Sequence, residues 1–223
     1  MKCCNKQNVS RRHVVKRIGL ISGLSAMPLG SALAKVATPY QVEGPFHPVD
    51  DQADTDLDLT IIDGNSDSAL GTQILVQGRA TDADGQPLAD ALVDVWQANT
   101  HGRYSHPRDK NTAPLDENFQ GWGLIRTDND GRYRFKTIEP GPYPLSFLGE
   151  EGWRCKHIHF KVSKPGSVEL VTQMYFAGDP LIEQDLEIAK VPEDHRSLLI
   201  SKPGLDEATG LPIYQFDMIL ANA

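Results

Sequence analysis

The sequence predicts an all-β protein, an antiparallel β-sandwich with long loops and one short helix. Two observations predict this fold class. Nineteen glycines and fifteen prolines interrupt the chain at short intervals, which leaves little room for long helices. Between these breaks lie short runs in which apolar and polar residues alternate, as they do in strands that bury one face.

Seven runs have the length and pattern of strands, and turn residues bound each of them. In chain order they are 73–81, 91–97, 132–137, 145–148, 156–163, 170–176 and 213–220. The clearest turns are Asp82-Ala-Asp-Gly85 and Asp128-Asn-Asp-Gly131, because Asp and Asn bond to the nearby backbone and Gly tolerates positive φ. One short helix is expected from Pro180 to about Ala189, with Asp179 as its N-cap.

The first 34 residues are expected to be an export signal of the twin-arginine type. Ser10-Arg11-Arg12-His13 is followed by a weakly apolar run, rich in Gly and Ser, that ends at Ala34. Glycines and Pro28 break this run, which is too short for a membrane span, although an uncleaved anchor and a disordered basic tail are alternatives. We therefore expect 35–223 to form a single domain that is periplasmic or otherwise exported.

Charge and cysteine content narrow the choice of partner. Six of the 22 Lys and Arg lie in the first 34 residues and none of the 30 Asp and Glu does, so the remaining chain is near −14. Phosphate binding depends on Lys and Arg, so we expect no nucleic acid partner, no membrane after cleavage, and a small soluble substrate. Cys155 would be the one thiol left, which excludes an internal disulfide.

The strand expected at 156–163 carries a candidate metal site. His157 and His159 lie two residues apart, and Ile158 and Phe160 alternate with them. Successive strand side chains point to opposite faces, so both imidazoles emerge on one side, about two 3.3 Å rises apart, where they can bind one metal ion. Two solvent-facing histidines are the alternative, and the pair alone does not name the metal.

Two tyrosines and one arginine accompany this pair. Tyr143 lies in a Pro-Gly-Pro-Tyr-Pro turn, Arg154 stands three residues before His157, and Tyr104 follows Gly-Arg. Each of them alone is more typical of a loop or a surface. Together, phenolate and imidazole favour a hard, highly charged ion such as Fe(III), whereas zinc usually takes Cys, His or carboxylate.

Part of the chain resembles a module that is commonly non-catalytic. The segments 78–93, 127–135 and 140–143 resemble transthyretin-like modules, which share an immunoglobulin-like sandwich core. An exported binding module without catalysis is therefore one alternative function. Another is a zinc or copper enzyme that uses His157 and His159 with His101 or His106.

Four longer motifs resemble the intradiol ring-cleavage dioxygenases, most closely the iron-bearing protocatechuate 3,4-dioxygenase type. They follow the order and spacing of that family from about Thr38 to the C-terminus, and they are Thr112-Ala-Pro-Leu-Asp-Glu-Asn-Phe-Gln-Gly121, Thr137-Ile-Glu-Pro-Gly-Pro-Tyr-Pro144, Trp153-Arg-Cys-Lys-His-Ile-His-Phe160 and Thr172-Gln-Met-Tyr-Phe-Ala-Gly-Asp-Pro180. Several motifs in register are far more specific than a lone His-x-His.

The resemblance implies a ligand set for a non-haem Fe(III). Tyr143 and His159 would be the axial ligands and Tyr104 and His157 the equatorial ones. The substrates would be a small aromatic diol, of the catechol or protocatechuate class, and O2. Both oxygen atoms would enter the product, a cis,cis-muconate-type diacid.

The resemblance also implies catalytic roles for three residues. Tyr143 would accept a proton from the diol, Arg154 would stabilise negative charge on the ring, and Gln173 would line the pocket. Members of this compact type associate, so a homo-oligomer or an assembly with a related chain is expected.

The sequence departs from the family at two places. Cys155-Lys156 replaces the usual Pro-Ala before the histidines, and Leu145 stands where protocatechuate enzymes have an aromatic residue. The segment 38–46 resembles one that lies near the pocket mouth, or it is an ordinary strand. Trp96-Gln97 belongs to the pocket side or to the core. The remaining histidines expected on the surface or in loops are His47, His101, His106 and His195.

Overall fold

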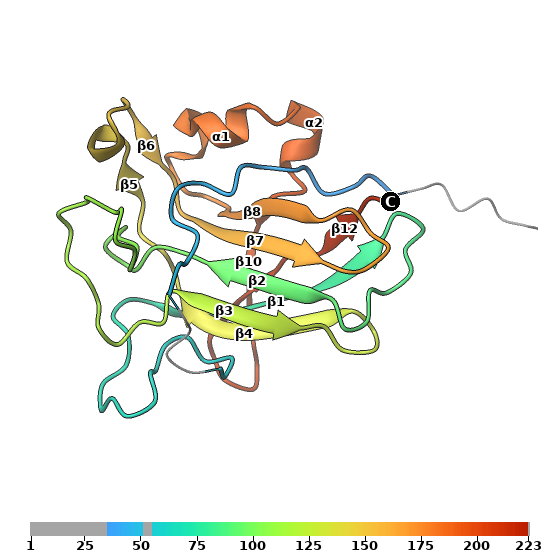
Figure 1. Cartoon of the computed structure of the whole chain (residues 1–223), viewed down its shortest axis with the longest axis horizontal. Helices are drawn as coiled ribbons and strands as arrows, with labels where there is room; N and C mark the ends of the chain where they lie inside the picture. Colours follow the sequence, from blue (N-terminus) through green and yellow to red (C-terminus); the bar gives the residue numbers. More distant parts are fainter. Residues whose placement is uncertain (1–34, 51–54, 223) are drawn as a thin grey trace, which may run out of the picture. The chain divides into compact units, whose positions relative to one another are not determined.

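Two five-stranded sheets pack face to face in the computed structural model, which describes residues 35–50 and 55–222. The expected export signal, 1–34, lies outside the described residues. The first sheet has the order β10-β11-β1-β12, with β4 paired to β1, and the second has the order β3-β2-β7-β8-β9 (Figure 1). The predicted all-β sandwich is confirmed.

The strands are short. The first sheet consists of β1 (Gln73–Asp82), β4 (Arg132–Ile138), β10 (Pro203–Leu205), β11 (Pro212–Gln215) and β12 (Met218–Leu220). The second consists of β2 (Leu92–Trp96), β3 (Trp122–Arg126), β7 (His157–Ser163), β8 (Leu170–Phe176) and β9 (Ile200–Ser201). A separate two-stranded ribbon pairs β5 (Tyr143–Pro144) with β6 (Trp153–Arg154).

Helical segments are short as well. They are the 3-10 turns η1 (Ser146–Leu148) and η2 (Ile182–Gln184) and the helices α1 (Leu186–Ala189) and α2 (Glu193–Arg196). Residues 145–148 were expected to be a strand, and this expectation is wrong, because the chain turns there and ends the turn at Gly149 with φ 82°. No helix among the described residues is long and apolar enough to cross a membrane.

The helix expected from Pro180 starts later than the sequence suggested. Its N-cap is Asp185, not Asp179, and the Asp185 side chain accepts the N–H groups of Glu187 and Ile188. Asp179 instead accepts the N–H of Lys156 and of Leu181, so its carboxylate braces the loop before the helix.

The last predicted strand, 213–220, is divided into β11 and β12. Both run parallel to β1, and they pair with its two halves on either side of Gly78. A Cβ on Gly78 would lie 1.8 Å from the carbonyl oxygen of Phe216, the residue at which the chain crosses between the halves. Glycine is therefore required where the two backbones approach.

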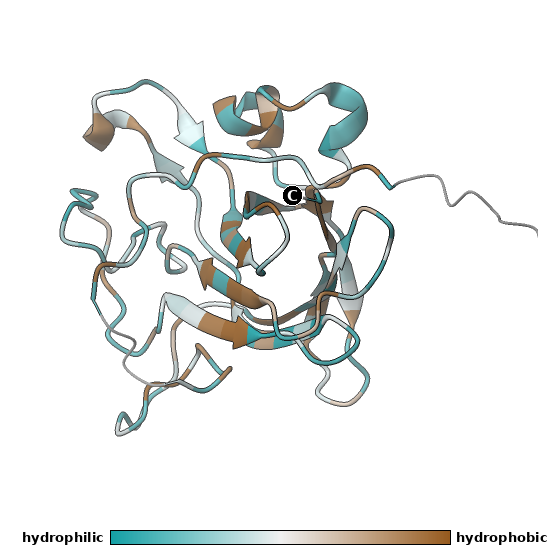
Figure 2. Ribbon diagram, turned by 45° about the vertical axis from the view of Figure 1, so that its right-hand side comes forward, coloured by the Kyte–Doolittle hydropathy of each residue, from teal (hydrophilic) through white to brown (hydrophobic). Residues whose placement is uncertain are grey.

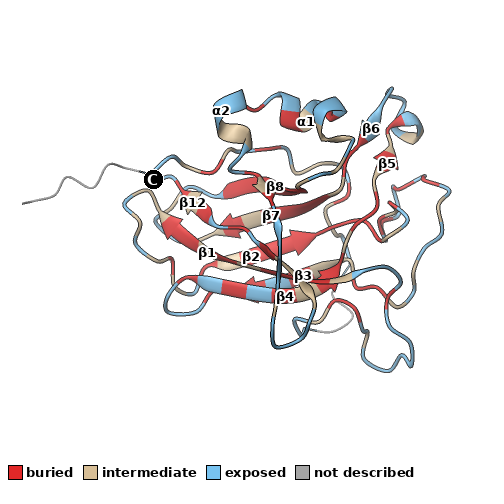
Figure 3. Ribbon diagram, turned by 180° about the vertical axis from the view of Figure 1, so that it is seen from behind, coloured by how far each residue is buried: buried red, intermediate tan, exposed pale blue. Residues whose placement is uncertain are grey.

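The apolar core lies between the two sheets. Strand β4 alternates between exposed and buried residues, whereas β8 is buried throughout (Figure 3). Hydrophobic segments concentrate on the strands, and polar ones on the loops and on α2 (Figure 2). On β7, Ile158, Phe160 and Val162 are fully buried in this core, as their alternation with the histidines predicted.

Candidate metal centre

Four side chains that the sequence singled out meet at one end of β7. The ring centres of His157 and His159 are 4.8 Å apart, and that of Tyr143 is 5.7 Å from His157. Tyr104 lies 5.7 Å from Tyr143 and 6.2 Å from His159, again between ring centres. Its Oη is 3.4 Å from Nε2 of His157, a separation that two ligands can have when each is about 2 Å from one ion.

All four donors are buried. The exposed fractions are 2% for His157, 3% for His159 and Tyr143, and 4% for Tyr104. The alternative of two solvent-facing histidines is therefore wrong. Strand β7 lies between β2 and β8, and in this register His159 faces Trp96 on one side and Gln173 on the other, so neighbouring strands cover the imidazoles.

The two tyrosines come from loops that are locked together. The backbone N–H of Tyr104 donates to Asp109 at 2.7 Å, which fixes the loop after β2. Gly102 has φ 76°, and a Cβ there would lie 2.2 Å from the carbonyl oxygen of Pro142, next to Tyr143. Only glycine lets the two loops approach so closely, so this contact brings Tyr104 and Tyr143 to the same point.

His157 is oriented by the backbone. Its Nδ1 lies 2.7 Å from the carbonyl oxygen of Cys155, so Nδ1–H donates and the lone pair of Nε2 faces Tyr104. His159 lies flat on the indole of Trp96, with ring centres 4.8 Å apart at an angle of 4°. Its buried Nδ1 has no hydrogen-bond partner in the described part of the chain.

Burial keeps these donors neutral. The pKa of each histidine is lowered by burial first, with the Arg154 charge adding to the effect for both, so the imidazoles carry lone pairs. Burial raises the pKa of Tyr104 and of Tyr143, although Arg154 opposes the rise. A metal cation placed among the four groups would favour the phenolates.

Two phenols and two imidazoles are a donor set that fits Fe(III). Within residues 35–50 and 55–222, no three His, Cys, Asp or Glu side chains gather closely enough to hold a metal. The zinc or copper site expected from His157, His159 and either His101 or His106 is therefore wrong.

Arg154 lies beside Tyr143 and is held on two sides. The β5–β6 ribbon pairs the two residues, and the Arg154 charge opposes the rise in the pKa of Tyr143. Nε donates to Asp185 at 2.9 Å, and Nη2 donates to the Gln173 side-chain oxygen at 2.5 Å. Burial alone would lower the pKa of Arg154, but electrostatic interactions with Tyr143 and Asp185 raise it, so this side chain is a permanent cation.

Gln173 connects Arg154 to the segment 38–46. Its amide donates to the carbonyl oxygen of Val42 at 3.0 Å. The segment, blue in Figure 1, runs along β8, where the Gln41 N–H donates to Val171. Phe46 then reaches Tyr104, with ring centres 4.9 Å apart. The segment therefore lies against the site and is not an ordinary strand.

A cluster of aromatic rings packs near Leu145. Phe147, two residues later in η1, has its ring centre 6.1 Å from Tyr143 and 6.1 Å from Phe46, on which it stacks. Leu145 is buried in the same small cluster as Tyr104 and Tyr143. The turn that follows Leu145 thus brings one aromatic ring close to Tyr143 and Phe46.

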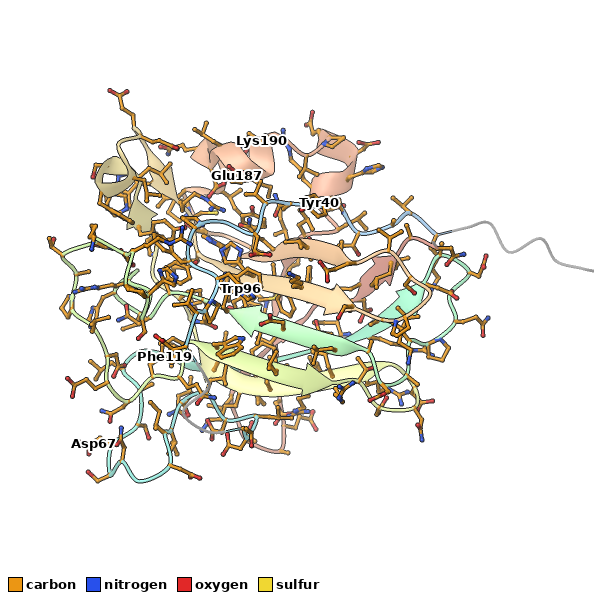
Figure 4. All side chains as sticks on the ribbon, in the orientation of Figure 1. Tyr40, Asp67, Trp96, Phe119, Glu187 and Lys190 are labelled. Atoms are coloured by element: carbon orange, nitrogen blue, oxygen red, sulfur yellow. The ribbon has the colours of Figure 1, made fainter. Side chains whose placement is uncertain are left out.

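Other predicted residues lie around the centre. Trp96 belongs to the site, and Gln97 to the core, where its amide donates to the Ile138 carbonyl at 3.0 Å. A cavity of about 190 Å³ is lined by Trp96 and Phe119, which are labelled in Figure 4, and it borders Tyr104 but not His157 or His159.

Two of the remaining histidines are less exposed than expected. His47 is half-buried and bonds to Asp94 at 2.9 Å, while His106 is buried. His101 is exposed in a loop, as expected, whereas His195 is half-buried and lies in helix α2.

Sequence reasoning missed Asp185 and Tyr175. Asp185 is fully buried against Arg154, and the Tyr175 hydroxyl bonds to Gln41 at 3.0 Å and to Gln173 at 3.2 Å. The run Asp185-Leu-Glu-Ile-Ala carried a signal, since an Asp before a short apolar run is typical of an N-cap.

Comparison with known proteins agrees with this geometry. The sequence profile of a family described as Dioxygenase matches residues 42–222. The protocatechuate 3,4-dioxygenase beta chain of Burkholderia cepacia is 45% identical over 181 residues, which are 79% of this chain and 76% of that protein.

A more distant relative and a solved structure extend the likeness. Catechol 1,2-dioxygenase 1 of Acinetobacter lwoffii is 36% identical over 162 residues, 68% of this chain, and the match spans 50% of that protein. The crystal structure of 3-chlorocatechol 1,2-dioxygenase from Rhodococcus opacus superposes with a TM-score of 0.65 at 27% identity, and covers 84% of this chain and 74% of that one.

Proposed function

Because the chain belongs to the intradiol ring-cleavage dioxygenase family, we propose that it is a non-haem Fe(III) enzyme that cleaves a catechol-type diol with O2. The observation that carries the proposal is the meeting of two buried phenols and two buried imidazoles at one end of β7. Such a donor set suits a hard ferric ion. The non-catalytic binding module offers no reason to bury all four groups together.

Tyr104, Tyr143, His157 and His159 would hold the iron. Bound there, Fe(III) would draw electron density from a chelated catecholate and make its ring reactive towards O2. A diol that binds as a dianion must release two protons. Tyr143 would accept one of them, because the metal would hold it as a phenolate and burial raises its pKa, which makes that phenolate basic.

Arg154 would stabilise the negative charge that develops on the ring oxygens. It is preorganised for this task, since Asp185 and Gln173 fix its guanidinium before any substrate binds. The aromatic rings of Phe46 and Phe147 would exclude water and stack against the substrate ring. Both oxygen atoms of O2 would enter the product, a cis,cis-muconate-type diacid.

The experiment is an absorption spectrum of the iron-loaded protein, followed by oxygen uptake with catechol, protocatechuate and hydroxyquinol. A red-brown tyrosinate-to-iron band and one O2 consumed per diol are expected, and the preferred diol assigns the substrate. A colourless iron-loaded protein overturns the proposal. A protein that binds diols without consuming oxygen would instead be the binding module.

Export and association complete the proposal. The first 34 residues would direct the folded protein out of the cytoplasm, and the domain would associate with copies of itself or with a related chain. The relationship to a protein named as a beta chain supports the second point. Sedimentation of the purified protein tests it, since a monomer at micromolar concentration would contradict self-association.

A further inference from the structure

Asp185 is a fully buried carboxylate outside the set of proposed ligands. Its two oxygens have separate partners. Oδ2 accepts Nε–H of Arg154 at 2.9 Å and the N–H of Cys155 at 3.0 Å, while Oδ1 accepts the N–H groups of Glu187 at 2.9 Å and Ile188 at 3.3 Å. One oxygen therefore faces the site, and the other caps α1.

Asp185 and Arg154 depend on each other electrostatically. An isolated buried charge is costly, whereas a paired and hydrogen-bonded one is tolerated. Burial tends to raise the pKa of Asp185, but the charge and hydrogen bond of Arg154 outweigh it and lower the pKa. Only 7% of the Arg154 side chain and none of the Asp185 side chain is exposed, so water does not screen the pair.

The contacts fix the plane of the guanidinium as well as its position. Asp185 holds the Nε edge, and Gln173 holds Nη2. A planar fork held at separate edges has no free rotation about its long axis. Without the Nε contact, the Arg154 guanidinium could rotate about its remaining hydrogen bond to Gln173.

The unusual Cys155 belongs to this arrangement. Its backbone N–H donates to Oδ2 of Asp185, and a proline at this position would have no N–H to donate. The N–H therefore gives Oδ2 a second donor, which keeps the carboxylate from rotating towards α1. This contact supplies a physical reason for the departure from Pro-Ala.

We propose that Asp185 is a positioning residue, which holds Arg154 where negative charge develops on the substrate ring. The proposal rests on the proposed function. It assigns Asp185 no contact with substrate or iron, so its effect on turnover must pass through Arg154.

Asp185→Asn separates the two tasks of the side chain. Asn is as good an N-cap as Asp, so α1 keeps its cap while the carboxylate charge is lost. We expect kcat to fall by roughly 10- to 100-fold, because small misplacements of a catalytic group cost about this much, with KM changed by less than about threefold. The iron-tyrosinate band should be retained.

The decisive measurement is a double-mutant cycle with Arg154→Ala. If Asp185 acts through Arg154, adding Asp185→Asn to Arg154→Ala should lower kcat by less than about twofold further. An equal fall in both backgrounds would overturn the proposal. The matched control is Glu187→Gln, the same carboxylate-to-amide change on α1 (Figure 4), which should leave kcat within about twofold of wild type.

A crystal structure of Asp185→Asn gives a readout that does not depend on activity. We expect a displaced guanidinium with α1 unchanged, and an undisplaced guanidinium would refute the positioning role. This result stands even if the wild-type protein consumes no oxygen with any diol, so failure of the proposed function and failure of this inference are distinguishable.

Discussion

His157 and His159 belong to a core strand through their backbones and to the candidate metal centre through their rings. Their backbones belong to β7, whose apolar residues Ile158, Phe160 and Val162 fill the sandwich core. The His159 ring stacks on Trp96, and the His157 ring lies tilted against Tyr175. Because both rings are buried and neutral, each has a lone pair available without loss of a proton. Removing either ring takes one ligand from the centre.

His159→Ala and, separately, His157→Ala are expected to abolish iron binding at stoichiometric iron. Three remaining donors leave a weaker and more open site. The measurement is iron content per chain after desalting, with His195→Ala, half-buried and distant in sequence, as the control. Full iron content in either ligand variant would mean that the iron site lies elsewhere.

Phe147→Ala is expected to raise KM for the preferred diol by roughly 10-fold, which corresponds to about 1.4 kcal/mol of lost aromatic contact. The Phe147 ring packs near Phe46 and Tyr143, two residues after Leu145. Steady-state kinetics measure the effect. Phe147→Tyr should retain most of the affinity, and an unchanged KM in Phe147→Ala would show that the ring does not touch the substrate.

At the scale of elements, strands with a periodic pattern could be predicted from the sequence. Places where two distant backbone segments come close together could not. The strands 73–81, 132–137 and 170–176 were found within one residue at each end, because alternation and turn residues mark them. The strand predicted at 145–148 was wrong, since an apolar run of four fits a turn as well as a strand. The division of 213–220 depends on Gly78, a residue more than a hundred positions away.

The residues of the candidate site likewise include some that the sequence indicated and some that it did not. The sequence pointed to Tyr143, His157, His159, Arg154 and Gln173 through motifs, and to Tyr104 through Gly-Arg-Tyr outside them. Asp185 was not, because its role requires a contact across 31 positions with Arg154, and no local pattern records that contact. The parallel pairing of β8 with β9 was hidden for the same reason.

Gly78→Ala is expected to destabilise the domain by about 3 kcal/mol or more, because a Cβ would overlap the Phe216 carbonyl and force β11 and β12 away from β1. Urea unfolding followed by circular dichroism measures the change. Gly204→Ala in β10 is the matched control, since its nearest atom would lie at 3.4 Å. A Gly78→Ala protein as stable as the control would refute this account of the crossing.

At the scale of the whole domain, stability should depend on pH through Asp185. Its pKa in the folded protein is lowered, because Arg154 outweighs the effect of burial. A lowered pKa contributes stability that is complete above the unfolded-state value, about 3.9, and is lost as the pH falls through the folded-state value.

The difference in unfolding free energy between wild type and Asp185→Asn should therefore be constant near neutral pH and should shrink below about pH 4. Chemical denaturation at a series of pH values measures it, with Glu187→Gln as the reference. A difference that grows on acidification would contradict the sign of the shift.

The export that we propose concerns the whole chain, including residues 1–34. Replacing Arg11 and Arg12 together by Lys should abolish export, because the paired arginines are what the twin-arginine signal requires. Cell fractionation with an antibody against the domain measures it. Unchanged export efficiency would mean that another route carries the protein.

The flat contact between Trp96 and His159 should make Trp96 fluorescence a reporter of metal binding. An indole 4.8 Å from an imidazole responds to any change in the electronic state of that ring, so filling the centre should quench the emission of Trp96. The other two tryptophans, half-buried Trp122 and Trp153, which is 47% exposed on the β5–β6 ribbon, should emit from more polar settings and at longer wavelength. Loading and unloading of the site can thus be followed in real time by fluorescence, without a label or a substrate.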